Sequence, residues 1–144
     1  MKVEEQVCKL ELAEKLRKLG VEQRSLWYWC RHEDAVQHHF AYELEWHDLD
    51  CRATSDKVAA FTVAELGEML PWSITRSDKQ KFAPVFYKNR GDFSDEFRWS
   101  VEYSSYTLDN GEIEVQCVAD NEADARAKIL IYLLKNKIIQ LLPC

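Results

Sequence analysis

Side chains able to hold a metal ion or to act as a nucleophile gather in one short stretch. All four histidines lie between Cys30 and Cys51, in the order Cys30-x-His32, His38-His39 and His47-x-x-x-Cys51. A structural zinc ion takes four such ligands as a tetrahedron, usually from two close pairs. Cys30 with His32 and His47 with Cys51 are therefore candidate metal ligands, although their spacings match no common zinc module.

Two other interpretations of this stretch are open. Cys30 can be a small buried apolar residue, with the histidines on a strand or loop surface, and this is the interpretation that we favour. A Cys–His nucleophilic pair would need a lowered thiol pKa and a third, orienting group, which the neighbouring sequence does not supply. The sequence thus assigns no catalytic residue, no metal and no cofactor, and it predicts a protein without enzymatic activity.

Pairs of carboxylates are frequent, but a site needs two carboxyl groups in different environments across a cleft. We interpret the pairs as solubilising charge, since strand spacing puts Glu112 and Glu114 on a solvated face. Phosphate-binding Gly-rich loops, Ser elbows and His-Glu-x-x-His segments are absent. The pairs are Glu43/Glu45, Asp48/Asp50, Asp92/Asp95 and Glu112/Glu114.

A ten-residue segment, 61–70, carries the pattern Thr62-x-x-Glu65. It resembles the first helix of helix-turn-helix and excisionase-type DNA-binding domains. The following Pro71 does not lead into the short turn and recognition helix of those domains. Nucleic-acid binding is the alternative function, and its candidate residues are the basic side chains Arg76, Lys79, Lys81, Lys88, Arg90 and Arg98.

These residues must be positioned by an α+β fold of one domain, residues 1–144. Hydrophobic periodicity predicts helices and strands around an antiparallel sheet of three to five strands, with helices packed mainly on one face. Thr62 and Glu65 form a capping box, and Gly20 ends the first helix. The predicted helices are 4–19, 63–70 and 121–139, the strands are 25–31, 40–46, 82–87, 97–104 and 112–117, and 72–81 is a polar connection.

Two strands are expected to form a hairpin through Asp109-Asn110-Gly111. Phe97, Trp99, Val101 and Tyr103 should share the apolar face with Ile113, Val115 and Cys117, while Ser100, Glu102 and Ser104 face solvent. A three-residue loop that pairs Tyr103 with Cys117 and Ser105 with Val115 keeps both apolar faces together, and it requires a bulge at Gly111.

The last helix is apolar on most of its circumference. One stripe, Ala123, Ala127, Leu130, Leu134 and Ile138, should cover the sheet, and the polar face shrinks to little more than Asp124, Lys128 and Lys135. Ile129 and Tyr132 fall outside that stripe. They are the candidate interaction surface, either for a protein partner or for self-association.

Composition and charge narrow the class of protein. The net charge of −6 weighs against a broad nucleic-acid footprint. The N-terminus lacks the apolar core of a secretory signal, and the longest apolar run is far shorter than the roughly 20 residues that span a bilayer. The five cysteines are odd in number and widely spaced. We therefore expect reduced thiols, a cytoplasmic location and no membrane partner.

As a whole, the chain resembles small uncharacterised α+β proteins found in bacterial genomes, often in prophage-like regions. The resemblance rests on segments 12–20, 60–70 and 122–134. It implies an N-terminal helix, a strand, a mid-chain helix, an antiparallel sheet and a closing helix. It also implies a phage-related accessory protein that acts through protein contacts, and it carries over no functional residue.

Overall fold

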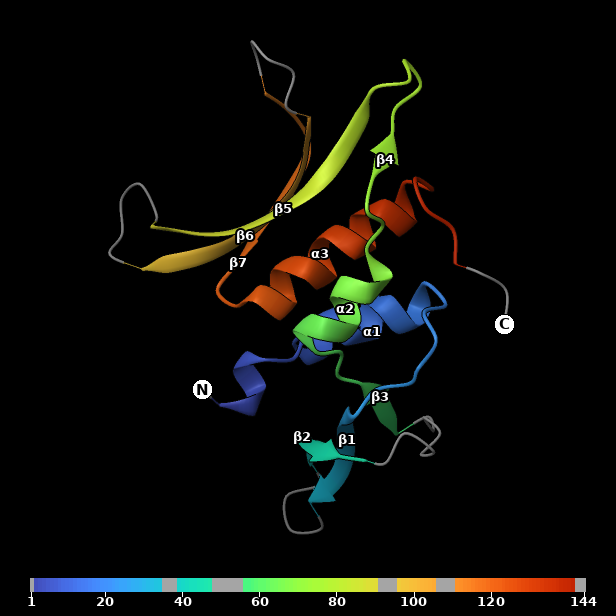
Figure 1. Ribbon diagram of the computed structural model, residues 1–144. Helices are drawn as coiled ribbons and strands as arrows, with labels where there is room; N and C mark the ends of the chain where they lie inside the picture. The colour runs from blue at the N-terminus through green and yellow to red at the C-terminus, as the bar shows by residue number, and fades with distance from the viewer. Residues whose placement is uncertain (1, 35–38, 48–55, 91–95, 106–110, 142–144) are drawn as a thin grey trace.

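The computed structural model describes residues 2–34, 39–47, 56–90, 96–105 and 111–141. It confirms the α+β class, and it divides the strands between two antiparallel sheets. Figure 1 shows the helices between a small sheet and a larger, curved sheet. The small sheet has the order β2-β1-β3, and the large sheet has the order β4-β5-β6-β7.

The first helical segment differs from the prediction. A short 3-10 helix, η1 (Val3–Glu5), is separated from α1 (Leu10–Lys18). Between them, Val7 forms a bridge with Thr62, and the Cys8 amide donates to the Phe61 carbonyl at 2.9 Å. These backbone bonds to a distant segment break the helix, although the apolar spacing across the break still looks helical. Gly20 ends α1 with a φ of +87°, as predicted.

The second helix, α2 (Val63–Met69), confirms its predicted start. The Thr62 hydroxyl accepts from the Glu65 amide, and the Glu65 carboxylate accepts from the Thr62 amide. The same carboxylate accepts from the Ser25 hydroxyl at 3.0 Å and from the Leu26 amide at 3.3 Å. Glu65 therefore joins α2 to the chain that enters the small sheet.

The small sheet contains β1 (Trp27–Asp34), β2 (His39–Trp46) and β3 (Lys57–Ala59). The large sheet contains β4 (Ile74–Thr75), β5 (Lys81–Arg90), β6 (Phe97–Ser105) and β7 (Glu112–Ala119). The β4 strand lies inside the stretch predicted to be a connection. Pro84 on β5 pairs with Tyr103 on β6 and has no β4 residue opposite it.

The last helix, α3 (Glu122–Lys135), begins at the cap Asn121 and covers one face of β6 and β7. It also contacts α1 and α2, and Ile129 is completely buried. Asp124 is buried too, contrary to its predicted place on the polar face, because it accepts from the Lys9 amide at 2.8 Å. The side chain of Asp124 therefore ties the start of α1 to α3.

The register of the β6–β7 pair differs from the prediction by two residues as far as Tyr103 and by three residues at Ser105. Tyr103 pairs with Val115 rather than Cys117, and Ser105 pairs with Glu112 rather than Val115. The even shift from Trp99 to Tyr103 leaves the apolar side chains of that part on the same face, so the facial argument could not detect it. The predicted loop residues 109–110 lie outside the described residues. The predicted bulge at Gly111 is therefore not tested and stays a prediction.

A register shift between Tyr103 and Ser104 leaves one extra residue, Glu114, on β7. This bulge turns Ile113 to the face of Ser104, so Ile113 is 51% exposed instead of inward. Phe97, also predicted inward, is exposed at the other end of the hairpin. The opposite face is not simply solvated, because Glu102 is buried and accepts from the Tyr87 hydroxyl at 2.7 Å.

Among the described residues, no helix is long and apolar enough to cross a membrane.

Candidate metal centre

The small sheet brings together donor side chains that are far apart in the sequence. Cys30 pairs with Glu43, and Tyr28 pairs with Glu45, in the antiparallel β1–β2 register. Because side chains alternate between faces, Cys30 and His32 on β1 share one face with Glu43 and Glu45 on β2. His47 follows the end of β2 on the same side.

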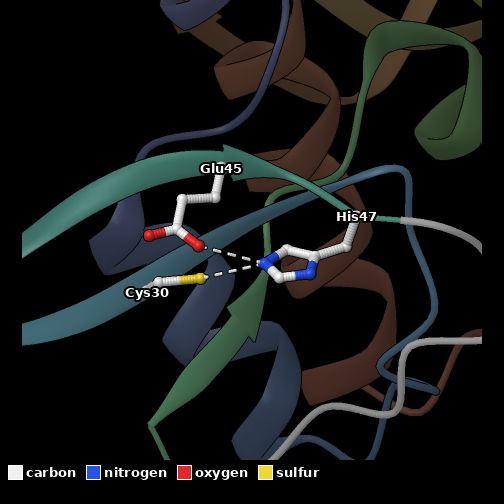
Figure 2. Close-up of side chains that lie close together, drawn as sticks. All are labelled: Cys30, Glu45 and His47. Atoms are coloured by element: carbon white, nitrogen blue, oxygen red, sulfur yellow. Dashed lines mark hydrogen bonds and ion pairs between the residues drawn. The ribbon is translucent and has the colours of Figure 1, made fainter.

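Three of these side chains converge, and we call Cys30, Glu45 and His47 the inner cluster. Each offers one ligand atom, and these atoms all lie within 4.8 Å of one another. His47 Nε2 lies 3.5 Å from Cys30 Sγ and 3.1 Å from a Glu45 oxygen, Oε2. Figure 2 shows both interactions meeting at this one ring nitrogen.

The inner cluster sits at the boundary between core and solvent. Cys30 is 3% exposed, whereas His47 and Glu45 are partly exposed. The His47 ring stands edge-on to the buried Tyr28 ring, with centroids 5.5 Å apart. The His47 amide also donates to the Leu26 carbonyl at 2.9 Å. The imidazole is therefore held by its backbone and by a packed aromatic ring.

The contacts at His47 decide between two kinds of chemistry. In a nucleophilic Cys–His arrangement, the thiol faces one ring nitrogen and the orienting group bonds the other. Here the sulfur of Cys30 and the carboxylate of Glu45 both face Nε2 (Figure 2). The Glu45 carboxylate thus competes with the thiol for the same nitrogen, which is unsuited to a proton relay.

The same geometry suits a bound metal ion. Sulfur and nitrogen ligands at tetrahedral angles on one zinc ion lie about 3.6 Å apart, and nitrogen and oxygen ligands lie about 3.3 Å apart. The corresponding distances at His47 are 3.5 Å and 3.1 Å. A thiolate, an imidazole and a carboxylate are all zinc ligands, and three of them leave a fourth position open.

His32 approaches Glu45 from the outside. Its Nε2 lies 2.5 Å from Glu45 Oε1, the carboxylate oxygen that does not face His47. This hydrogen bond, together with those from Cys30 and His47, lowers the pKa of Glu45 below its usual value. The carboxylate is therefore kept ionised, which is the form that binds a cation.

The structure unites part of the predicted ligand set. Cys30 and His47 meet, His32 lies one contact away through Glu45, and Cys51 lies outside the described residues. Sequence reasoning considered Glu45 only as part of a carboxylate pair. The alternation of polar residues at 43, 45 and 47 could have placed it beside His47.

The basic residues proposed for nucleic-acid binding do not form a free patch. Arg76 contacts the carboxylates of Asp78, Glu112 and Glu114, and its guanidinium lies over the Phe82 ring. Lys88 lies over the rings of Phe97 and Trp99 on the curved sheet, and Arg98 lies 3.7 Å from Asp120. Lys79, Lys81 and Arg90 are exposed on the β4–β5 hairpin and at the end of β5.

The two residues of the predicted interaction surface also separate. Ile129 is fully buried by the chain itself, and Tyr132 is 38% exposed.

Comparisons with known proteins return no relationship: no protein-family model, no curated protein and no solved structure matches the chain.

Proposed function

We propose that the protein binds a divalent transition-metal ion of the zinc class at the inner cluster of Cys30, Glu45 and His47. The single observation that carries the proposal is the meeting of a sulfur and a carboxylate oxygen at one imidazole nitrogen, at spacings close to those of ligands on one zinc ion. The soft thiolate excludes magnesium and calcium as preferred ions, since these take oxygen ligands.

The surroundings favour this use of the three side chains. Tyr28 and the backbone bond to Leu26 hold the imidazole, so little side-chain order has to be gained on binding. Ionised Glu45 and a thiolate at Cys30 would together balance the charge of a divalent ion. Solvent reaches His47 and Glu45, which gives the ion a route of entry and its fourth position a water molecule.

The test is a titration of the reduced, full-length protein with Co²⁺, followed by displacement with Zn²⁺. We expect one equivalent of Co²⁺ to produce a thiolate-to-cobalt charge-transfer band, which Zn²⁺ removes. Cys30→Ser should abolish the band, and His47→Ala should weaken binding at least tenfold.

Cys117→Ser is the matched control, because Cys117 is a partly buried thiol on the large sheet and does not belong to the inner cluster. It should retain the band unchanged. A wild-type chain without the band, or a band that survives Cys30→Ser, would overturn the proposal.

The accessory role in protein contacts remains a proposal that rests on the sequence resemblance. Its self-association part was motivated by uncovered apolar surface on the last helix. Burial of Ile129 within the chain removes that motive for this residue. For the nucleic-acid alternative, the three carboxylates around Arg76 leave its charge committed within the protein. Neither role is favoured by an observation as specific as the inner cluster.

A further inference from the structure

We infer that a second divalent cation binds next to the first, at an outer cluster formed by His32, Glu43 and the outward oxygen of Glu45. This inference rests on the proposed function, because Glu45 would bridge the two ions. The second ion would belong to the class that accepts nitrogen and oxygen ligands, such as Mn²⁺ or Zn²⁺.

The outer cluster follows from the same β1–β2 pairing as the inner one. His32, Glu43 and Glu45 each offer one ligand atom, and these atoms lie within 4.8 Å of one another. Glu43 is the cross-strand neighbour of Cys30, and His32 is two residues beyond it on the same face. The two clusters thus overlap along one ladder: Glu43 is directly opposite Cys30 of the inner cluster, and Glu45 belongs to both clusters.

The carboxylate of Glu45 is divided between the two clusters. Oε2 faces His47, and Oε1 faces His32. A carboxylate with each oxygen aimed at a different imidazole has the arrangement needed to bridge two ions. In two-metal sites the ions are about 3.5–4 Å apart, a separation that one carboxylate can span.

The outer position is closed by a hydrogen bond between His32 Nε2 and Glu45 Oε1. His32 Nε2 and Glu45 Oε1 are 2.5 Å apart, which is a hydrogen-bond distance, whereas two ligands on one ion lie about 3.3 Å apart. The second cation must therefore replace this hydrogen bond and move the imidazole outward. The His32 side chain is 50% exposed, so that movement meets little resistance.

The charges predict that the outer ion binds more weakly than the inner one. With one ion bound, Cys30 and Glu45 already balance its charge, and Glu43 alone remains to balance the second.

The experiment uses the full-length chain loaded with one equivalent of Zn²⁺ and then titrated with Mn²⁺, with free Mn²⁺ measured by electron paramagnetic resonance. We expect one further equivalent of Mn²⁺ to bind. Glu43→Gln and His32→Ala should each weaken Mn²⁺ binding at least tenfold, while the Co²⁺ band of the inner cluster stays intact. Glu68→Gln, an exposed carboxylate on α2, is the control that should change nothing.

The outcomes separate the two proposals. A Cys30-dependent Co²⁺ band without Mn²⁺ binding would overturn the outer site alone. Absence of the band would overturn the inner site, whether or not Mn²⁺ binds. If Glu43→Gln and His32→Ala weaken the inner ion instead, these residues only position Glu45, and the outer site is overturned.

Discussion

The two sheets share antiparallel pairing but differ in how far the helices bury one face. In the large sheet, Val101 and Tyr103 are fully buried because α3 covers their face along the middle of β6. In the small sheet, burial declines along β1, from Tyr28 through Cys30 to the exposed His32. Where the cover ends, the small sheet carries Cys, His and Glu side chains in place of apolar ones.

This difference explains where a site can form in a chain without an obvious motif. A fully covered face must be apolar or hydrogen-bonded, since burying unpaired polar groups is costly. On a sheet face where burial decreases gradually, one candidate ligand can be buried, as Cys30 is, while its neighbours are partly exposed to solvent, as Glu45 is. The helices act as the common support for both sheets (Figure 1).

The largest expected effect on the free energy of unfolding comes from a substitution in α3, the helix that covers the large sheet. Leu133 on α3 is fully buried, and Leu133→Ala should lower the free energy of unfolding by about 2–5 kcal/mol through lost contacts and a cavity. Trp46→Ala, at a 62% exposed position on β2, should cost less than about 1 kcal/mol. Urea denaturation measures both, and equal losses would contradict the contrast between the sheets.

A bound metal should stabilise the small sheet selectively. At a free Zn²⁺ concentration of about 100 times Kd, linkage adds about 2.7 kcal/mol to the free energy of unfolding. Native-state hydrogen exchange should show the added protection first in β1 and β2. Chelation should reverse the effect, and Cys30→Ala should remove it. If adding metal protects β6 and β7 as much as β1 and β2, and at the same metal concentration, the result would argue against a site local to the small sheet.

Local sequence signals predicted the elements well. The Thr62–Glu65 capping box and the Gly20 helix end depend on neighbours within a few residues, and both are confirmed. The α1 start was wrong because the Cys8 amide bonds to Phe61, more than fifty residues away. Pairings of this range leave no periodic trace in the sequence.

The candidate site was predictable only in part, for the same reason. Spacing selected Cys30 and His47 as possible ligands, but only the cross-strand register shows that they meet and that Glu45 joins them. The β6–β7 hairpin gives the matching lesson. Parity was correct at Tyr103, but the partner was two residues off because a pleat repeats every two residues.

The third prediction concerns the joint between α1 and α3, on the covered side. Asp124 is buried, accepts from the Lys9 amide and lies 3.3 Å from Lys9 Nζ. Asp124→Ala leaves that amide unpaired and should cost about 1–3 kcal/mol in thermal or urea unfolding. The neighbouring Asp120→Ala is exposed and should stay within about 0.5 kcal/mol. Similar losses for both would refute the proposed joint.

The buried thiol of Cys8 predicts a smaller, alkaline effect. Burial, as the main cause, raises the pKa of Cys8 from 9.0 to about 12. Because the pKa is raised in the folded state, the full contribution of Cys8 to the free energy of unfolding is present below pH 9. It is lost as the pH rises from 9 towards 12, where the thiol ionises in the unfolded chain but not in the folded one. The loss should reach about 1.4 kcal/mol at pH 10. Cys8→Ala should flatten this part of the stability–pH curve, and an unchanged slope would assign the loss to other groups.

The smallest effect tests the exposed end of the small sheet. The hydrogen bond from His32 is the largest cause that lowers the pKa of Glu45. A lowered carboxylate pKa stabilises the fold above the usual value of about 4.5, and that stabilisation is lost as the pH falls through the lowered pKa. His32→Ala should move the Glu45 titration, followed by NMR of its carboxyl carbon, back towards the usual value. A midpoint that does not move would mean that Cys30 and His47 alone lower the pKa of Glu45. The hydrogen bond from the exposed His32 would then make no contribution.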